Sequence, residues 1–434
     1  MSSDFQFATE FTGEPGEDEV VGYRLGNGLR VVMLKRHRVP VVAVDLWYLV
    51  GSKNEQPGKS GFAHLFEHMM FEGSAHVGKA QHIKFINDVG GMVNASTSQD
   101  RTNYWEVVPA NQLRLALWLE ADRMKSLKLT EENFQNQRST VKEERRLRVD
   151  NQPYMRVLYE LKDEVAYQRF PYAHSVIGSM EDLDRATLSD ARHFHDTYYR
   201  PNNTILAIAG DFQVKEALAI VREYFEEIPA GPPVPSVDLT EPPQQKEKRV
   251  NYQDPFAPYP AYLVSYHIPE RSHPDFYPLG ILDRVLLDGE SSRLYRHLVE
   301  EKQMVLHLTG GWDGKLGPAL FYIFAQLRPG YTFAQLETLL DQEMKAVIDH
   351  PLSEAEIRKA KNKILAEHYS QLETVRQIAD QLCFYTTLFG NPELIYQEVE
   401  RFRQVTVRDV RRVARQYFRK ENRSVILIHP NTGE

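Results

Sequence analysis

The pattern of apolar and polar residues near the start of the chain predicts β-strands joined by tight turns. Residues 20–25 and 29–34 are strand-like and meet at Gly26-Asn27-Gly28, and an Asn-Gly pair between two such runs favours a hairpin. Residues 41–50 are rich in β-branched and aromatic side chains, which predicts a buried strand. A further strand pair is expected within residues 92–108.

Helix-like stretches alternate with these strands. After the glycines at 58 and 61, a helix of about three turns is predicted over residues 62–72. A long helical stretch follows Pro109, and another helix spans about residues 131–149. Residues 204–209 predict a strand that closes this half of the chain.

Residues 229–249 have the composition of a linker. They combine prolines with Gln, Lys and Glu, a mixture that stays extended and does not pack as a core element. We therefore place a domain boundary there, with an N-terminal domain at 1–228 and a C-terminal domain at 250–434. The prolines are Pro229, Pro232, Pro233, Pro235, Pro242 and Pro243.

The C-terminal half resembles a copy of the N-terminal half. Residues 186–206 align with residues 405–425 when the sequence is shifted by 219 positions. The identical pairs are Thr187 and Thr406, Asp190 and Asp409, Arg192 and Arg411, Tyr198 and Tyr417, Arg200 and Arg419, and Asn203 and Asn422. The other matched segments are 41–50 with 260–269 and 62–72 with 281–291. This duplication predicts an α+β fold of two similar domains, each a sheet with helices packed on one face.

The composition is that of a globular protein and narrows the functional classes. The 434 residues are 42% hydrophobic and 26% charged, so each half has enough apolar material for its own core. The net charge of -8 gives no general support for nucleic-acid binding. The one cysteine, Cys383, excludes an intramolecular disulfide and lies in an apolar run, so we interpret it as a buried thiol.

No targeting or membrane segment is expected. Residues 1–16 are polar and acidic and lack the basic and apolar regions of a signal peptide. The chain has no run of about 18 apolar residues, so we predict no membrane span. We expect a cytoplasmic protein, with the periplasm as the alternative if a leader has been removed from a precursor.

Two histidines and a glutamate on the helix predicted at 62–72 form a candidate metal site. His64 and His68 are four residues apart, so both imidazoles project from one face and can bind a single metal ion. Glu67 falls near that face and can take a proton from a water molecule. The order His-x-x-Glu-His is the inverse of the commoner zinc-peptidase motif. As a bare pattern, it fits a solvated helix face about equally well.

A catalytic zinc ion takes three protein ligands and keeps one position open, so a third ligand is needed. The helix at 131–149 offers Glu143 and Glu144. On a helical wheel, Phe134 and Val141 define its inward face, and Glu144 falls near that face while Glu143 points away. We therefore predict Glu144 as the third ligand. The alternative is that it is one of several surface charges in a charged run.

In combination, these motifs resemble the pitrilysin family of inverted-motif zinc peptidases, especially the branch that includes mitochondrial processing peptidase. The resemblance covers nearly the whole chain. In that family the third ligand is a glutamate 76 residues after the second histidine, which is the separation of His68 and Glu144. Residues 90–95 resemble the family's substrate-pairing segment, which implies that Asn94 and Ala95 bind substrate. Two further segments resemble its domain-closing strand: 199–203 and 209–211.

The resemblance implies a zinc-dependent peptide hydrolase. One Zn²⁺ per chain would be bound by His64, His68 and Glu144, with Glu67 as the general base. The peptide substrate would lie extended as an added strand beside residues 92–98.

Several positions depart from the family pattern. The family often has an acidic residue seven positions before the ligand glutamate, and here that position is Gln137. Members that act alone carry an arginine and a tyrosine in the second domain, and Val299 and Leu306 stand at the matching positions. If the alignment slips, the replacements would come from Tyr295, His307, Arg293 and Arg296. In the second copy of the metal helix, Asp283, Leu286 and Leu287 replace His64, Glu67 and His68.

We therefore expect this chain to hold the metal half of an active site and to lack the half that stabilises the oxyanion. A homologous partner subunit carrying the Arg/Tyr pair would supply it, and the heterodimer would enclose the substrate as a clamshell of which each chain forms half. Two alternatives remain: a non-catalytic assembly subunit related to the core proteins of respiratory complexes, and a self-sufficient homodimeric peptidase.

Overall fold

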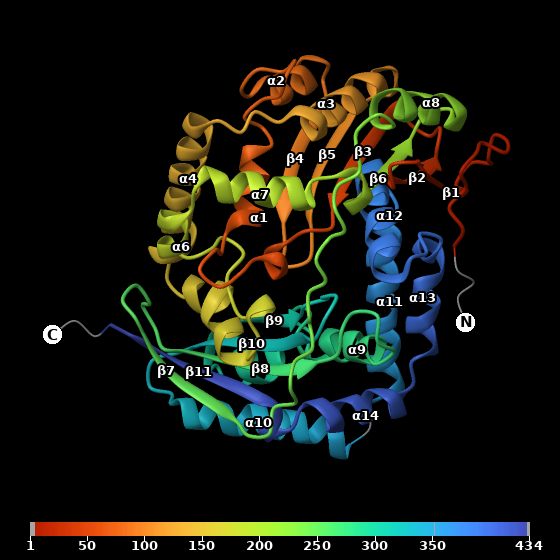
Figure 1. Ribbon diagram of the computed structural model, residues 1–434. Coiled ribbons are helices and arrows are strands. Elements are labelled where there is room, and N and C mark those ends of the chain that lie inside the picture. The colour runs from red at the N-terminus through yellow and green to blue at the C-terminus, as the bar shows by residue number, and fades with distance from the viewer. Residues whose placement is uncertain (1–4, 351, 432–434) are drawn as a thin grey trace. The chain divides into compact units, whose positions relative to one another are not determined.

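The computed structural model describes residues 5–350 and 352–431, which form two compact units with one sheet each (Figure 1). Unit 1 comprises Met1–Glu143, Ser175–Val237 and Tyr369–Gln397, and unit 2 comprises Glu144–His174, Asp238–His368 and Glu398–Glu434. Each half of the chain therefore contributes one segment to the unit built mainly by the other half. Within the described residues, no helix is long and apolar enough to cross a membrane.

The sheet of unit 1 has six strands, and it confirms the predicted hairpin, buried strand and strand pair. Its order is β1 (Val20–Arg24), β2 (Arg30–Lys35), β6 (Thr204–Gly210), β3 (Val41–Tyr48), β5 (Thr102–Pro109) and β4 (Met92–Thr97). β2 and β6 are parallel, whereas the other neighbours are antiparallel. This order leaves β4, the strand predicted to meet substrate, at one end of the sheet.

Helices cover one face of this sheet. They are α1 (Phe62–Met69), α2 (Gln81–Asp88), α3 (Leu113–Ser126), α4 (Glu131–Arg145), α6 (Met180–Arg185), α7 (Leu188–Tyr198) and α8 (Val214–Phe225). Side chains alternate along β3, so Val44 and Leu46 join the core that includes Phe66 of α1 and Phe134 of α4. This core fixes the two helices that carry the predicted metal ligands against one sheet.

The opposite face of the same sheet is covered by α12 (Val375–Phe389), a helix that the sequence did not place there. α12, drawn blue in Figure 1, contacts β3 and β6, and its Ile378 and Leu382 pack on Ala43 and Trp47. Cys383 is fully buried in this layer, with Sγ 3.7 Å from the carbonyl oxygen of Asp45, which confirms the predicted buried thiol. The segment then continues into α13 (Leu394–Gln404).

Unit 2 repeats the plan of unit 1, as the duplication predicts. Its five strands run in the order β7 (Lys248–Asp254), β11 (Arg423–Pro430), β8 (Ala261–Ile268), β10 (Ala319–Leu327) and β9 (Val305–Trp312), with β7 and β11 parallel. This is the order of β2, β6, β3, β5 and β4 in unit 1. The α+β fold with a duplicated sheet-and-helix domain is therefore confirmed.

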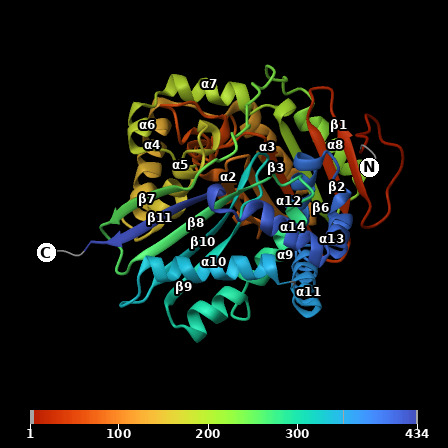
Figure 2. The same cartoon turned by 90° about the horizontal axis from the view of Figure 1, so that it is seen from below.

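Helices also lie on both faces of the second sheet. α9 (Phe276–Leu286), α10 (Phe333–Asp349) and α14 (Val407–Tyr417) share the main core of unit 2, whereas α5 (Lys162–Ala166) contacts β8 and β11 from the other face (Figure 2). α11 (Glu354–Ser370) follows α10. α5 comes from the N-terminal half and α12 from the C-terminal half, so the two halves exchange covering segments. The predicted domains at 1–228 and 250–434 are continuous in sequence. The compact units differ from them because each includes the covering segment that comes from the other half of the chain.

The helix predicted at 281–291 is the clearest error of the sequence analysis. The observed helix, α9, begins five residues earlier and ends at Leu286. Gly289 adopts a left-handed conformation (φ +80°) that ends regular helix, so residues up to 291 cannot continue it. The predicted helix at 62–72 likewise ends at Met69, and Gly73 follows in a left-handed conformation (φ +106°). The helix predicted at 131–149 is α-helical to Arg145 and continues as a π-helical turn.

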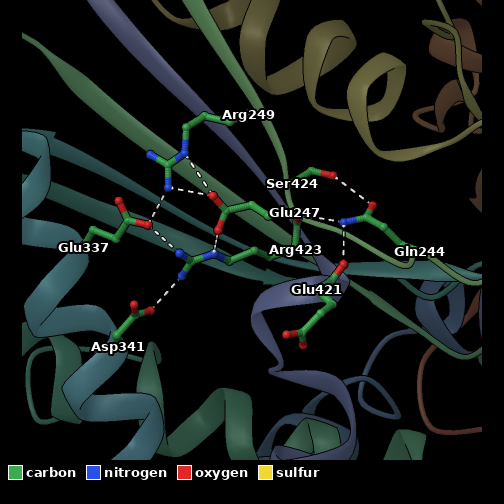
Figure 3. Close-up of polar contacts among 8 residues, drawn as sticks. All are labelled: Gln244, Glu247, Arg249, Glu337, Asp341, Glu421, Arg423 and Ser424. Atoms are coloured by element: carbon green, nitrogen blue, oxygen red, sulfur yellow. Dashed lines mark hydrogen bonds and ion pairs between the residues drawn. The ribbon is translucent and has the colours of Figure 1, made fainter.

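The end of the proline-rich linker is fixed to the second sheet by a buried arginine (Figure 3). Arg423, 2% exposed, donates to Glu247 at 2.6 Å and to Asp341 at 2.7 Å, and it also bonds Glu337. The side chain of Gln244 donates to the carbonyl oxygen of Arg423 at 2.6 Å. These contacts hold the last residues of the predicted linker, where β7 already begins.

Candidate metal centre

The start of α1 is held by a buried carboxylate and a glycine. Glu55 accepts hydrogen bonds from the backbone nitrogens of Gly61 (2.9 Å) and Ala63 (2.8 Å), so a negative charge meets the positive end of the helix dipole. Gly61 has φ +91°, and a Cβ there would lie 2.8 Å from the carbonyl oxygen of Ile177. Glycine is therefore required, and the direction of the metal helix is fixed before the first histidine.

α1 buries one face and presents the other. Phe62, Leu65, Phe66 and Met69 are buried in the core, whereas His64, Glu67 and His68 are half-buried. The rings of His64 and His68 lie 5.0 Å apart between centroids, as the four-residue spacing predicts. The motif therefore lies on the face of the helix turned away from the apolar core.

α4 brings a carboxylate to this face. The donor atoms of His64, His68 and Glu144 all lie within 4.8 Å of one another. Glu143 is exposed and Glu144 is half-buried, which agrees with the helical wheel. α4 is one continuous helix through this point, although the boundary between the compact units falls between these two glutamates. Arg148, one turn later, lies 2.7 Å from Glu144 between Nη1 and Oε1.

The donor set fits a zinc ion. Two imidazole nitrogens and one carboxylate oxygen are a ligand set of catalytic zinc sites, which leave a fourth position open. Zinc bonds of about 2.0–2.2 Å in tetrahedral geometry separate neighbouring ligand atoms by about 3.5 Å. A spacing within 4.8 Å therefore needs little side-chain adjustment to close on an ion.

The predicted general base is oriented by the edge strand. Thr97 Oγ1 donates a hydrogen bond of 2.6 Å to Glu67 Oε2. Thr97 is the last residue of β4, the strand that carries Asn94 and Ala95. Thr97 could not be predicted from the sequence, because nothing in the local pattern shows which strand residue faces the helix.

Asn94 and Ala95 lie where the resemblance implies a peptide would bind. They pair with Trp105 and Tyr104 of β5, and β4 is the last strand of the sheet within the described residues. The side chain of Asn94 accepts from the backbone nitrogen of Ala95 at 2.8 Å. The geometry permits an added strand at this edge.

Gln137 joins α4 to the residues that follow the metal helix. Its Nε2 donates to Glu72 Oε1 at 2.6 Å, and Lys79 Nζ lies 2.8 Å from Glu72 Oε2. Asn133, one turn earlier on α4, donates to the carbonyl oxygen of Glu72 at 3.3 Å. Glu72 is buried, so the carboxylate missing at position 137 is present on the facing segment. Glu72 could not be predicted from the sequence, since only the fold brings it to α4.

A second group of potential metal ligands, His82, Glu106 and Glu120, lies fully buried nearby in unit 1. A protein cation already occupies it: Arg123 donates to both carboxylate oxygens of Glu120 and lies 3.6 Å from Glu106. Burial, reinforced by the Arg123 charge, lowers the pKa of His82 to about 3. We interpret this group as a buried ion-pair network.

The network also supports α1. The Arg123 guanidinium lies 4.4 Å from the centre of the Tyr104 ring, a cation–π contact. Tyr104 OH donates to the carbonyl oxygen of Phe66 at 2.8 Å, next to the predicted base. A buried polar chain therefore runs from α3 through β5 to the metal helix.

Unit 2 holds the residues that stand where the family has its arginine and tyrosine. Val299 is half-buried against the core of unit 2, and Leu306 is 40% exposed on β9. Among the candidate replacements, Arg293 is engaged by Glu356 at 2.7 and 3.1 Å, and Arg296 is 62% exposed. These arginines belong to the same unit as Val299 and Leu306.

Comparison with known proteins decides the family. Residues 30–179 match the family described as Insulinase (Peptidase family M16), and residues 185–364 match the one described as Peptidase M16 inactive domain. The zinc protease PqqE of Helicobacter pylori is 30% identical over 410 residues, which are 94% of this chain and 92% of that protein. The chain belongs to the M16 peptidase family.

Two further matches, one to a solved structure and one to a sequence, extend over nearly the whole chain. The crystal structure of a protease from Helicobacter pylori superposes with a TM-score of 0.91 at 29% identity, covering 95% of this chain and 100% of that one. The probable mitochondrial-processing peptidase subunit beta of Arabidopsis thaliana is 22% identical over 94% of this chain and 77% of its own length. The M16 inactive-domain match includes Asp283, Leu286 and Leu287, where the second copy lacks the motif.

Proposed function

We propose that this M16 protein is a zinc-dependent endopeptidase subunit. The observation that carries the proposal is the convergence of His64, His68 and Glu144 donor atoms within 4.8 Å, beside a glutamate oriented by Thr97. Relatives named zinc proteases support the choice of metal. One zinc ion per chain would be bound by these three side chains.

The residues around the proposed metal site would have different roles in peptide hydrolysis. Zinc bound there supplies Lewis acidity towards a peptide carbonyl and a water molecule. Glu67 accepts the proton of the attacking water, and the hydrogen bond from Thr97 holds its carboxylate in one orientation. The capped start of α1 and the Tyr104 bond to Phe66 keep the helix itself in place.

The substrate would bind as a strand beside β4. Backbone groups at this edge can pair with an extended peptide, and Asn94 and Ala95 lie at the middle of the strand. Main-chain pairing gives affinity with little demand on side-chain identity, so we propose unfolded or extended peptides as substrates.

A homologous partner subunit would complete the site. A tetrahedral oxyanion needs hydrogen-bond donors, and neither Val299 nor Leu306 carries one on its side chain. Loss of one such donor commonly costs about 10²–10³-fold in rate, so a chain lacking both should turn over very slowly alone. We propose a heterodimer in which the partner contributes an arginine and a tyrosine.

The test is an assay of the zinc-loaded chain on unfolded peptides, alone and mixed with its homologous partner. The proposal predicts about one zinc per chain, weak hydrolysis alone and strong hydrolysis on mixing. Robust turnover that is unchanged by the partner would contradict the heterodimer and favour a homodimeric enzyme. Stoichiometric zinc without hydrolysis in the complete assembly would contradict the peptidase proposal and favour an assembly subunit.

A further inference from the structure

The surface of α14 in unit 2 carries a cluster of four arginines. Arg408, Arg411, Arg412 and Arg415 lie on a helix of eleven residues that has one acidic residue, Asp409. The chain as a whole is acidic, with a net charge of -8. The positive charge of this helix is therefore opposite in sign to the net charge of the chain.

The matching helix of unit 1 is an internal control. α7 and α14 coincide after the 219-residue shift, and both begin with a capping box, Thr187 with Asp190 and Thr406 with Asp409. The positions of Arg408, Arg412 and Arg415 are held in α7 by Ser189, His193 and Asp196, which are also exposed. The same helix in the same fold is thus built without these three arginines.

Arg411 differs from the other three because its role is structural. It donates to the carbonyl oxygen of Ile348 at 3.1 Å, and its counterpart Arg192 donates to the carbonyl oxygen of Leu129 at 3.1 Å. Ile348, near the end of α10, and Leu129, just after α3, are themselves 219 residues apart, so both copies use this arginine for the same contact. Comparison of the two copies therefore distinguishes Arg411, which has the same packing role in both, from the other three arginines of α14.

Of the other three arginines, Arg412 is held by Asp275 at 2.6 Å and stays 49% exposed. Arg408 and Arg415 are exposed and form no ion pair within the described part of the chain. Their charges act on Asp409 and Asp349, whose carboxyl pKa values are lowered. With Val407 and Gln416, the four arginines line a shallow, open part of the surface formed by α14 alone. Positions 408, 411 and 415 follow one helix face over about 10 Å.

We propose that this arginine face of α14 is a docking surface for an acidic segment of another polypeptide. The planar guanidinium group binds carboxylates in a bidentate fashion, which suits aspartate and glutamate side chains. An extended strand places same-face side chains about 7 Å apart, so two or three carboxylates fit along the arginines.

A membrane surface is the rival occupant, and two observations disfavour it. None of the exposed large apolar side chains in the described residues lies on α14 or on α9, α10 and β8, which contact it, so these elements offer no apolar side chain for insertion into lipid. The overall negative charge would also repel the rest of the protein from an anionic bilayer.

The test uses the substitutions that unit 1 already carries. The double variant Arg408→Ser/Arg415→Asp takes the residues of α7 at both positions and leaves Arg411 and Arg412 in place. The probe is a glutamate octapeptide, titrated against the zinc-loaded protein at about 0.1 M salt, where the Debye length is about 10 Å. We expect the variant to bind about tenfold more weakly, since it loses two charge pairs and gains one repulsion.

The matched control removes the same amount of charge elsewhere. Arg38→Asp/Lys246→Ser changes two exposed cations on other surfaces and should leave peptide affinity within about twofold. If the first variant is poorly folded by thermal melting, Arg408→Gln/Arg415→Gln replaces it with the same expectation. Equal binding by parent and variant, an equal loss in the control, or tighter binding to phosphatidylserine vesicles than to the peptide would each overturn the proposal.

Discussion

Two pairs of helices share a backbone plan and differ in chemistry. One pair is α1 and α4, which carry the candidate metal ligands, and the matching pair in the second copy is α9 and α11. The sheets have the same strand order, and α7 and α14 have the same bounds after the 219-residue shift. At the four matched positions, His64, Glu67, His68 and Glu144 give way to Asp283, Leu286, Leu287 and Lys363. The fold therefore does not depend on the metal-site residues, and the candidate chemistry is confined to one copy.

In unit 2, cationic side chains lie at or beside the positions that match the candidate metal ligands. Asp283 is buried beside Arg284, with Oδ2 2.6 Å from Nη1, and burial raises the pKa of its carboxyl to about 7 against the opposing charge of Arg284. Lys363, at the position of Glu144, donates to the carbonyl oxygen of Asp288 at 2.8 Å. An ammonium group thus stands in the second copy where the first copy has the carboxylate of the proposed third ligand, Glu144.

The largest effect is expected from converting a ligand of unit 1 into its unit 2 counterpart. His68→Leu removes one of the three proposed ligands, and zinc affinity should fall by more than the 10–100-fold typical of changes to residues that hydrogen-bond metal ligands. Hydrolysis should fall to background with it. Zinc titration and peptide assay check both results. The reverse change in unit 2, Leu287→His, should add no zinc, since Lys363 occupies the position of the third ligand. Parental affinity in His68→Leu would refute the assigned site.

A substitution of Glu67 tests whether hydrolysis can be lost while zinc binding is kept. Glu67→Gln should keep zinc and reduce the rate by about 10²–10⁴-fold, because an amide of the same shape cannot accept the proton. Thr97→Val removes the hydrogen bond to this carboxylate and should cost about tenfold. Both rates are measured in the complete assembly with zinc content checked in parallel. More than about a tenth of the parental rate in Glu67→Gln would be incompatible with a general-base role.

Gln137 tests how the two copies support the same helix pair. Its counterpart in unit 2 is Glu356, which pairs with Arg293, whereas Gln137 faces Glu72. Gln137→Glu would place two carboxylates in contact and should weaken zinc binding by about tenfold. The exchange variant Glu72→Gln/Gln137→Glu restores one donor and one acceptor and should recover most of the affinity. Unchanged zinc affinity in the single variant would show that the Glu72 contact does not position α4.

A further difference between the two copies concerns acid stability. His195 of unit 1 is buried, and burial lowers its pKa to about 4, whereas its counterpart in unit 2 is Ala414. In the unfolded chain this imidazole is protonated near its ordinary pKa of about 6.5. Above that pH the imidazole is neutral in both the folded and the unfolded protein, so it does not change the stability. Stability should then fall as the pH drops from about 6.5 towards 4. The loss at pH 5 is on the order of 2 kcal/mol.

Chemical unfolding of the parent and of His195→Phe at pH 7.5 and pH 5 checks this expectation. Phenylalanine keeps an aromatic ring against Phe66 and Tyr199 and removes the titration. The stability lost between the two pH values should be smaller in the variant. His82, which burial also keeps neutral, remains in both proteins, so some acid sensitivity persists. An identical loss in parent and variant would exclude His195 as a source of the acid sensitivity.

The sequence by itself determined the parts of the molecule that depend on neighbouring residues. The turn at Asn27-Gly28, the alternation along β3 and the spacing of His64 and His68 act over a few positions, so their outcomes follow from local geometry. The duplication was readable because both copies keep the same caps and apolar positions at one offset. The helical wheel also distinguished Glu144 from Glu143, since both lie on one regular helix.

The tertiary structure decided what depends on residues far apart in the chain. The contacts of Glu72 with Gln137 and of Thr97 with Glu67 join different elements, and no local pattern encodes which elements meet. The exchange of α5 and α12 between the halves, and the sorting of Arg411 from the other arginines of α14, likewise required the packed sheets. Periodicity states which face of an element is apolar, whereas packing selects the surface that covers it, and the candidate site is assembled at that second step.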